Sequence, residues 1–583
     1  MNAVRNEEFS LNIKKYEYFE QSFQAAFTGN PFDIDLAVIV KCPDESTKKI
    51  YGFYDGENIF TFRFMPEQIG EYSFKTICKI NKLNNKTGSF TCIKNDESNH
   101  GKVTVCDKYW FSYDDGTPYF PTGTTCYAWI HQSLELQAQT IQTLSNGCFN
   151  KVRMCVFPKW YEYNHSQPYI YPFEGNEKTG FDYDKPNVAF FKHLDNCIMQ
   201  LEKIGVEADV ILFHPYENDN WQFNFMTPEQ DLRYLKYITA RLSAFHNVWW
   251  SLANEYDLIR TGYKKKKSSW NRLIETVSNY DCSNHLISIH QLNKMFDHKN
   301  KYITHCSIQR TELFLTAEYT DTWREKYGKP VIIDECVYEG NLNAWWGGIT
   351  AEEMVRRFWE ATARGGYLSH GETYLTEDEK IWWSHGGSLI GKSPQRIKFL
   401  RQIMLECSDM KITSESGTSN TARGIADTNT QLIYLGNYQP YNYSFTLLGN
   451  SKYKIKIIDT WNMTVDELPD LYERNVTVDL PSKPYMAILC TAKEKADSSV
   501  FTRDSVFEEM KFTVGGRKML KFLKKICAPY YSGMLQFTVN QCSKQAGGIL
   551  DGKAGDGILT VVNENKFFKG MFQLTTGVLF RRR

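Results

Sequence analysis

Strand-like and helix-like segments alternate between about residues 100 and 405, and this alternation constrains the fold more than any other feature of the chain. Several strand-like segments, such as ADVILFH and VIIDE, are almost entirely apolar, as is typical of parallel strands covered by helices. The pattern predicts eight strands, at 118–126, 149–157, 206–214, 248–255, 285–290, 303–308, 331–335 and 366–372. It predicts helices at 134–144, 188–204, 228–245, 270–277, 312–327, 351–363 and 394–405, with no clear helix between the fifth and sixth strands.

Eight strand–helix units in one stretch predict an α/β fold with a (β/α)8 barrel, the TIM barrel. A doubly wound open sheet is the alternative architecture for the same alternation. Such a sheet often binds a dinucleotide through a glycine-rich loop after its first strand. Here the first strand leads into GTTCYAW, which lacks that glycine pattern, so the barrel is favoured.

The regions on either side of this stretch have a period of two instead. Phe60, Phe62 and Phe64 share one face of a strand, and Asp55-Gly56 offers a turn. Tyr453, Ile455 and Ile457 repeat the pattern near the other end of the chain, so each region is interpreted as a β-sandwich. The expected organisation is an N-terminal β-sandwich at 1–98, the barrel at 99–406, a C-terminal β-sandwich at 407–495 and a basic, glycine-rich tail with short helices at 496–583.

Charge and hydropathy exclude several classes of protein. The 68 basic residues balance the 68 acidic ones, which argues against a general nucleic-acid binder. No run approaches the roughly 18 apolar residues of a membrane span. The first residues show no apolar core of a secretory signal, so a cytoplasmic location is expected, with the 15 cysteines serving as small buried hydrophobes.

Two expected strands end in a glutamate. VWWSLANEYD places Glu255 at the end of the fourth strand, and KPVIIDECVYEG places Glu335 at the end of the seventh. Strand ends converge on one face of a barrel, and hydrolysis of a glycosidic bond requires two carboxylates that face each other. Asp334 is the rival of Glu335, but it is expected on the opposite side of its strand.

Further polar and aromatic residues at strand ends are expected to contact a sugar. They are His214, His290, His370, Glu372 and Trp382. The 12 histidines include no HExxH motif or short paired spacing, so neither a metal nor a cofactor is expected. A catalytically inactive carbohydrate-binding protein and a metal-dependent barrel lyase remain alternative interpretations.

The motifs resemble those of the clan A glycoside hydrolases, in which an Asn-Glu pair ends strand four and a Glu ends strand seven. The layout is similar to that of bacterial apiosidase-like glycoside hydrolases, and IFTFRFMPEQIGEYSF at 59–74 resembles their N-terminal domain. The resemblance implies a retaining mechanism, with Glu335 as nucleophile and Glu255 as acid and base. It also implies that Asn254 holds the sugar's 2-hydroxyl and that Arg153 lies beside the nucleophile.

The expected substrate is therefore a carbohydrate, a small oligosaccharide or glycoside whose sugar and linkage the sequence does not specify. A homo-oligomer is left open.

Overall fold

The computed structural model of the chain describes residues 11–493 and 520–521, apart from 162, 166, 218–219, 260–264, 378–380, 408–413, 420–421, 427–428 and 448–450. These residues belong to two compact units, Met1–Phe358 with Gly366–Leu405, and Trp359–Gly365 with Glu406–Arg583. Within the described part of the chain, no helix is both long and apolar enough to cross a membrane. The tail expected at 496–583 lies outside the described residues, except for 520–521.

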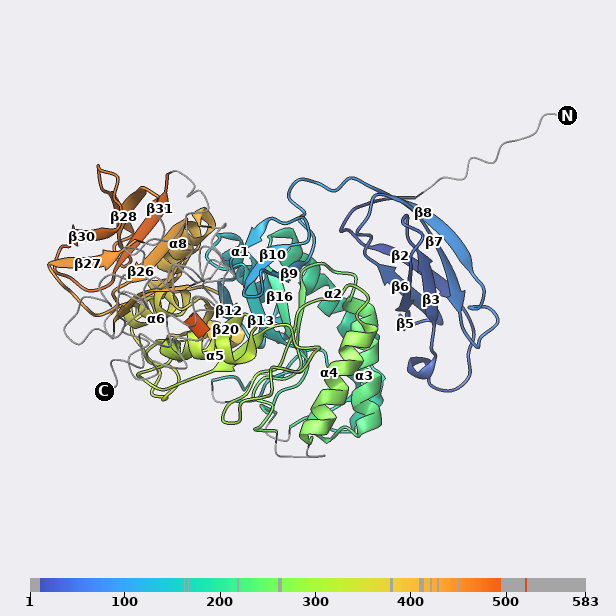
Figure 1. Ribbon diagram of the computed structural model, residues 1–583. Coiled ribbons are helices and arrows are strands. Elements are labelled where there is room, and N and C mark those ends of the chain that lie inside the picture. Colours follow the sequence, from blue (N-terminus) through green and yellow to red (C-terminus); the bar gives the residue numbers. More distant parts are fainter. Residues whose placement is uncertain are drawn as a thin grey trace, which may run out of the picture. The chain divides into compact units, whose positions relative to one another are not determined.

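Eight parallel strands form the central sheet of the first unit (Figure 1). They are β12 (Gly123–Thr125), β13 (Lys151–Cys155), β16 (Glu207–Ile211), β17 (Val248–Ser251), β18 (Ile287–Ser288), β19 (Cys306–Gln309), β20 (Val331–Glu335) and β22 (Tyr367–His370). Hydrogen-bonded neighbours follow the order β18-β17-β16-β13-β12-β22-β20-β19. The backbone N–H of Thr304 donates to the Ile287 carbonyl over 2.9 Å between the two end strands. The sheet is therefore nearly closed, which confirms the predicted TIM barrel.

Helices connect most of the strands. They are α1 (Leu134–Ser145), α2 (Val188–Lys203), α3 (Pro228–Leu242), α4 (Lys267–Tyr280), α5 (Thr320–Tyr327), α6 (Ala351–Ala363), α7 (Trp382–His385) and α8 (Ser393–Glu406). The helix expected at 312–327 is shorter, because Leu315 has a φ of 61°, which a right-handed helix excludes. The structure has no helix between β18 and β19, as the pattern predicts.

Two sheets at the N-terminus enclose an aromatic core. One has the order β1-β8-β7-β3-β4 and the other β2-β6-β5. Phe60, Phe62 and Phe64 of β6 lie in the core between the sheets, as the period of two predicts. The bounds are β1 (Asn12–Lys14), β2 (Phe19–Gln24), β3 (Ala37–Lys41), β4 (Thr47–Tyr51), β5 (Phe53–Tyr54), β6 (Ile59–Phe64), β7 (Gly70–Ile77) and β8 (Thr87–Ile93).

The second unit contains a six-stranded sheet of order β24-β25-β26-β31-β28-β29 and a two-stranded antiparallel sheet, β27-β30. Tyr453, Ile455 and Ile457 lie in its core, again as the alternation predicts. The bounds are β24 (Ser414–Ser419), β25 (Ala422–Ala426), β26 (Thr430–Tyr434), β27 (Asn442–Thr446), β28 (Tyr453–Asp459), β29 (Thr464–Glu467), β30 (Asn475–Asp479) and β31 (Met486–Ala492). Short sheets elsewhere are formed by β9 (Val103–Cys106), β10 (Trp110–Tyr113) and β11 (Pro118–Tyr119), by β14 (Phe173–Asn176) and β15 (Gly180–Pro186), and by β21 (Glu339–Gly340) and β23 (Glu372–Thr373).

An irregularity in β20 determines where its two acidic residues point. Ile308 pairs with Ile333, but the next residue, Gln309, pairs with Glu335, so Asp334 is the extra residue of a β-bulge. Asp334 is therefore not on the outer side of the strand, as the regular alternation predicted. Its carboxylate is completely buried and lies 2.9 Å from the Nζ atom of Lys151 on β13.

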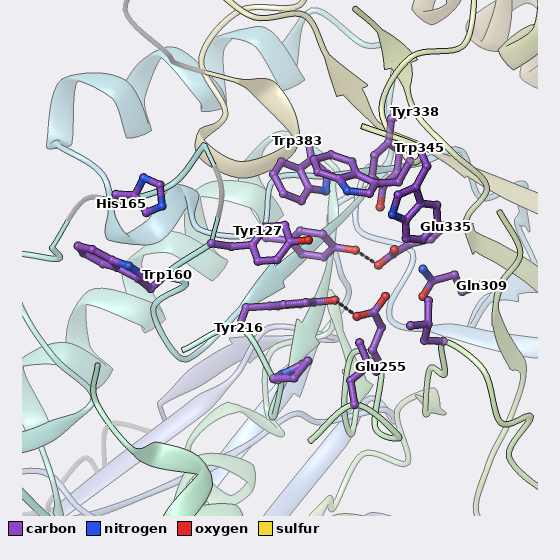
Figure 2. Close-up of a pocket in the computed structure, with 15 residues that line it drawn as sticks. Tyr127, Trp160, His165, Tyr216, Glu255, Gln309, Glu335, Tyr338, Trp345 and Trp383 are labelled. Carbon is purple, nitrogen blue, oxygen red and sulfur yellow. Dashed lines mark hydrogen bonds between the residues drawn. The ribbon is translucent and has the colours of Figure 1, made fainter. Parts of the chain in front are cut away.

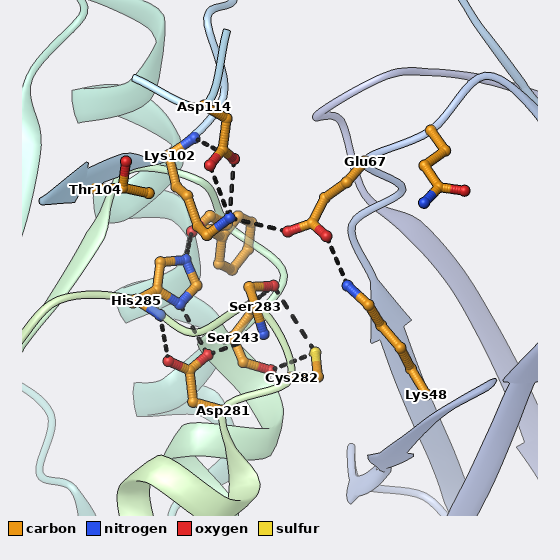
Figure 3. A network of polar contacts seen from close by, with 12 residues as sticks. Lys48, Glu67, Lys102, Thr104, Asp114, Ser243, Asp281, Cys282, Ser283 and His285 are labelled. Atoms are coloured by element: carbon orange, nitrogen blue, oxygen red, sulfur yellow. Dashed lines mark hydrogen bonds and ion pairs between the residues drawn. The ribbon is translucent and has the colours of Figure 1, made fainter. Parts of the chain in front are cut away.

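Buried ion pairs join the N-terminal sandwich to the barrel. Arg63 of β6 lies 3.0 Å from Asp195 of α2, and Arg241 of α3 lies 2.7 Å from the same carboxylate. In a second contact, Lys102 binds Glu67 at 2.9 Å, and Glu67 also binds Lys48 at 2.6 Å (Figure 3). The first contact is buried and holds β6 against α2 and α3, whereas the second is partly exposed, with Lys48 31% and Glu67 28% exposed.

Replacement of Asp195 by alanine should destabilise the protein by about 3–5 kcal/mol, because two buried guanidinium groups lose a shared partner. The measurement is the urea dependence of the first unfolding transition. Asp182→Ala is the matched control, since that carboxylate is largely exposed and pairs with Lys185, and it should change the stability by less than about 0.5 kcal/mol. Equal effects of the two substitutions would contradict this interpretation of the buried pairs.

Candidate active site

A cavity of about 600 Å³ opens at the ends of the barrel strands (Figure 2). Both predicted glutamates line it. Most of the other lining side chains are aromatic, and the full set is Tyr127, Trp160, Tyr161, His165, Pro215, Tyr216, Glu255, Leu258, Leu292, Gln309, Glu335, Tyr338, Trp345, Trp346 and Trp383. The cavity thus presents two carboxylates in a wall of tyrosine and tryptophan rings.

Glu335 ends β20 and is held by three neighbours. Its Oε1 atom accepts hydrogen bonds from the Tyr127 hydroxyl and, over 3.0 Å, from the Nδ2 atom of Asn254. The guanidinium of Arg153 lies 3.9 Å from the same oxygen. One cation and two hydrogen-bond donors therefore converge on this carboxylate.

Glu255 is in a different environment. Its backbone has a φ of 45°, a left-handed conformation that is unfavourable for a residue with a side chain and is often found at functional sites. The Tyr216 hydroxyl donates to its Oε2 atom over 2.5 Å. Burial, and then the negative charge of Glu335, raise the pKa of Glu255 to about 7. This carboxyl can therefore carry a proton at neutral pH.

Asn254 links the two carboxylates. Its Nδ2 atom donates to the Tyr216 hydroxyl over 2.8 Å as well as to Glu335, and its Oδ1 atom accepts from Arg153 over 3.0 Å. The arginine can only donate, so this contact fixes which end of the amide faces Glu335.

A buried charge network lies beneath the site. Lys151 Nζ is 2.8 Å from Asp209 and 2.9 Å from Asp334, and Arg153 Nε is 3.5 Å from Asp209. Burial opposes ionisation of Asp334, but the charges of Lys151 and Arg153 hold its pKa well below the usual range. Asp334 thus binds the Lys151 ammonium within the barrel, and Glu335 is the carboxylate that reaches the cavity.

His214 and His290 lie behind the cavity wall and do not line it. His214 Nδ1 accepts from the backbone N–H of Tyr216 over 3.0 Å, and burial lowers the pKa of this histidine to about 4. His290 Nδ1 accepts from the backbone N–H of Glu255 over 3.4 Å. Both neutral rings therefore support the loops that carry Tyr216 and Glu255.

His370, Glu372 and Trp382 are also buried away from the cavity lining. The Thr124 hydroxyl joins two of them, since it bonds His370 Nδ1 over 3.0 Å and accepts from Trp382 Nε1 over 2.9 Å. The neighbour of Trp382, Trp383, lines the cavity instead. From the segments after β20 and β22, the side chains that line the cavity are Tyr338, Trp345, Trp346 and Trp383.

Glu339, His370 and Glu372 bring potential metal ligands within 4.8 Å of one another. However, both carboxylates already accept backbone N–H groups, Glu372 from residues 390 and 391 and Glu339 from residues 392 and 393. The positive ends of these groups, at the start of α8, satisfy the carboxylates and oppose a cation. The arrangement is therefore explained as an anchor for the loop before α8.

Several functional candidates carried only a weak signal in the sequence. Tyr127 lies in GTTCYAW after the first strand and Tyr216 in LFHPYEN after the third. Their places at strand ends are visible in the sequence, but the contact of each hydroxyl with a particular glutamate is not. Lys159, which is packed against both rings, has no sequence signal.

Family models match three parts of the chain. The model described as apiosidase-like, catalytic domain, matches residues 106–392, and two domains of unknown function, DUF5060 and DUF5605, match 12–79 and 419–491. A crystal structure described as a "putative glycoside hydrolase" from Bacteroides vulgatus ATCC 8482 is 38% identical, with a TM-score of 0.77. The match covers 83% of this chain and 100% of that one. The chain belongs to the apiosidase-like glycoside hydrolases.

A more distant structure, described as a glycoside hydrolase family 5 protein from the same organism, is 14% identical with a TM-score of 0.51. The match covers 69% of this chain and 96% of that one, and it shows a shared fold. A comparison with curated protein sequences finds no match. The apiosidase-like glycosidase is thus an enzyme with a TIM barrel and flanking β-sheet regions, as the sequence predicted.

We expect Glu255 to donate the proton that the leaving group needs. The kcat/KM of the glycosidase should therefore fall as the pH rises above about 7, where Glu255 loses that proton. Tyr216→Phe removes a hydrogen bond that favours the ionised form of Glu255, so the pKa should rise and this limb should move to higher pH. The measurement is the pH profile of kcat/KM for both enzymes.

Tyr234→Phe is the matched control, since this buried hydroxyl bonds the Leu212 carbonyl over 3.1 Å and touches neither carboxylate. The basic limb of its kcat/KM profile should coincide with that of the unmodified enzyme. An unmoved limb in Tyr216→Phe would contradict the assignment of the titrating group to Glu255.

Proposed function

We propose that this glycosidase hydrolyses small oligosaccharides or glycosides with retention of configuration. The proposal depends on one observation: two carboxylates share a cavity but have opposite environments. Glu335 accepts two hydrogen bonds and lies beside the guanidinium of Arg153, whereas burial raises the pKa of Glu255 to about 7. One group is thus suited to attack and the other to donate a proton.

In the first step, an oxygen of Glu335 attacks the anomeric carbon. Glu255 transfers its proton to the glycosidic oxygen as the bond to the leaving group breaks. The products are an alcohol and a sugar joined to Glu335 through an ester bond. Loss of the proton leaves Glu255 ionised, a form that the Tyr216 hydroxyl stabilises over 2.5 Å.

In the second step, the ionised Glu255 removes a proton from water, and the water oxygen attacks the anomeric carbon. The ester bond breaks and Glu335 leaves as a carboxylate, again beside Arg153. Two inversions at one carbon give net retention.

The cavity supports a small substrate. Its volume of about 600 Å³ is typical of sites for small molecules. Trp346 and Trp383 pack against each other, with ring centroids 4.6 Å apart and planes tilted by 32°, and both line the cavity, where an aromatic face suits the C–H faces of a sugar. Asn254 uses both amide hydrogens on Tyr216 and Glu335, so toward a sugar hydroxyl it has only the second lone pair of Oδ1 to offer.

Replacement of either glutamate should separate the two roles. Glu335→Ala should abolish turnover of every aryl glycoside, because the nucleophile is lost. Glu255→Ala should remain active on activated aryl glycosides, whose leaving groups need little protonation, and should lose about 10²–10⁴-fold on alkyl glycosides. The measurement is kcat/KM over a series of leaving groups, starting from a panel of aryl glycosides that identifies the sugar.

Azide provides the stereochemical test. It should rescue Glu255→Ala and give a glycosyl azide of retained configuration, whereas any rescue of Glu335→Ala should give the inverted product. Glu312→Ala removes an exposed carboxylate on the loop after β19 and serves as the control. Its kinetics should equal those of the unmodified enzyme. Inversion in the product of the unmodified enzyme would exclude the retaining mechanism.

A further inference from the structure

Lys159 is a buried lysine next to the cavity that no step above uses. Its side chain is 1% exposed, and its Nζ atom has no hydrogen-bond partner among the described residues. A buried cation without such partners is unfavourable unless other groups stabilise it.

Four aromatic rings surround this ammonium group. Nζ lies 3.5 Å from the ring centroid of Trp383, 4.6 Å from Tyr127, 4.8 Å from Tyr216 and 5.4 Å from Tyr161. All four rings line the cavity. The faces of aromatic rings attract a cation, so these contacts stabilise the charge and hold the rings around it.

Two of these rings also hold the glutamates. The Tyr127 hydroxyl donates to Glu335 and the Tyr216 hydroxyl to Glu255 (Figure 2). A single cation therefore packs against both side chains that orient the two carboxylates.

We propose that Lys159 is a positioning residue, which holds Tyr127 and Tyr216 against the two glutamates and whose charge favours the ionised form of Glu255. The inference rests on the proposed roles of Glu255 and Glu335. Lys159 is buried behind the rings, so it acts through them and through its charge without touching the substrate.

The charge of Lys159 is sensitive to pH near neutrality. Burial lowers its pKa to about 7, against the effects of Cys155 on β13 and of Glu335 and Glu255. His214, after β16, also faces it but is neutral, because burial lowers the pKa of His214 to about 4. Among the residues that the structure describes, the other titratable groups around Nζ are the hydroxyls of the surrounding tyrosines, and burial raises the pKa of both Tyr127 and Tyr216.

The charge acts on the proposed acid in a definite direction. A cation nearby stabilises ionised Glu255 and lowers the pKa of Glu255. As the pH rises through about 7, Lys159 loses its proton and this effect disappears. The loss of charge should extend the range over which Glu255 stays protonated.

Two substitutions separate charge from packing. Lys159→Met keeps an unbranched chain without charge, and Lys159→Arg keeps a charge at every accessible pH. The basic limb of kcat/KM, measured on an alkyl glycoside that needs protonation, should move to higher pH in Lys159→Met and should not move upward in Lys159→Arg. Because Tyr127 and Tyr216 lose the cation that holds them against the glutamates, kcat should fall about 10–100-fold in Lys159→Met with little change in KM. Lys301→Met, which removes an exposed lysine stacked on Tyr302, should leave both quantities unchanged.

A second measurement needs no turnover, and two of its three proteins keep Lys159, so those two stay informative if Lys159→Met folds poorly. In Glu255→Gln, protonation of Lys159 should change the emission of Trp383, 3.5 Å away. The midpoint should lie below about 7, because this variant lacks a carboxylate that raises the pKa of Lys159. This transition should vanish in Glu255→Gln/Lys159→Met and in Glu255→Gln/Trp383→Phe. The same transition in all three proteins, or a pH profile of Lys159→Met identical to that of the unmodified enzyme, would overturn the inference. If the Glu335→Ala and Glu255→Ala variants still showed the kinetics and azide products predicted above, only the role of Lys159 would have failed.

Discussion

The buried charges inside the barrel are the interaction on which the active site depends. Lys151 lies within 2.9 Å of both Asp209 and Asp334, and the guanidinium of Arg153 lies 3.5 Å from Asp209. Removing these groups from water is unfavourable, and only close opposite charges make their burial tolerable. The network therefore has one satisfactory geometry, which places Arg153 against Asn254 and beside Glu335. A replacement by apolar residues could fill the same volume but could not orient the carboxylate.

Above this network, the site separates into two halves with different electrostatics. Glu335 rests on the charged interior of the barrel, whereas Glu255 lies against aromatic rings and a neutral histidine. Asn254 joins the halves through its amide group. The difference between the two carboxyl groups thus follows from their neighbours, since the groups are chemically identical and almost equally buried.

The sequence predicted the barrel, the flanking β-sheets and the strands that carry Glu255 and Glu335, because apolar periodicity and strand-end position are local signals. It placed Asp334 on the wrong side of β20, since a bulge depends on pairing with β19 and leaves no local signal. His370, Glu372 and Trp382 also ended strands or followed them, yet long loops carry other side chains into the cavity. The roles of Tyr127, Tyr216 and Lys159 arise from contacts between distant segments, which a single sequence does not reveal.

Two backbone irregularities have a common consequence for how much chemistry a short strand can hold. A regular strand offers every second residue to the inside of a barrel. The bulge lets the neighbours Asp334 and Glu335 of β20 both face inward. Asn254 and Glu255 follow β17, which ends at Ser251, and there the left-handed φ of Glu255 departs from strand geometry and lets both side chains face inward. Each strand end therefore directs two neighbouring side chains inward, where a regular strand would direct one. The chain needs no extra strand to supply them, but a substitution that restored ideal strand geometry would leave half of these groups facing the helices.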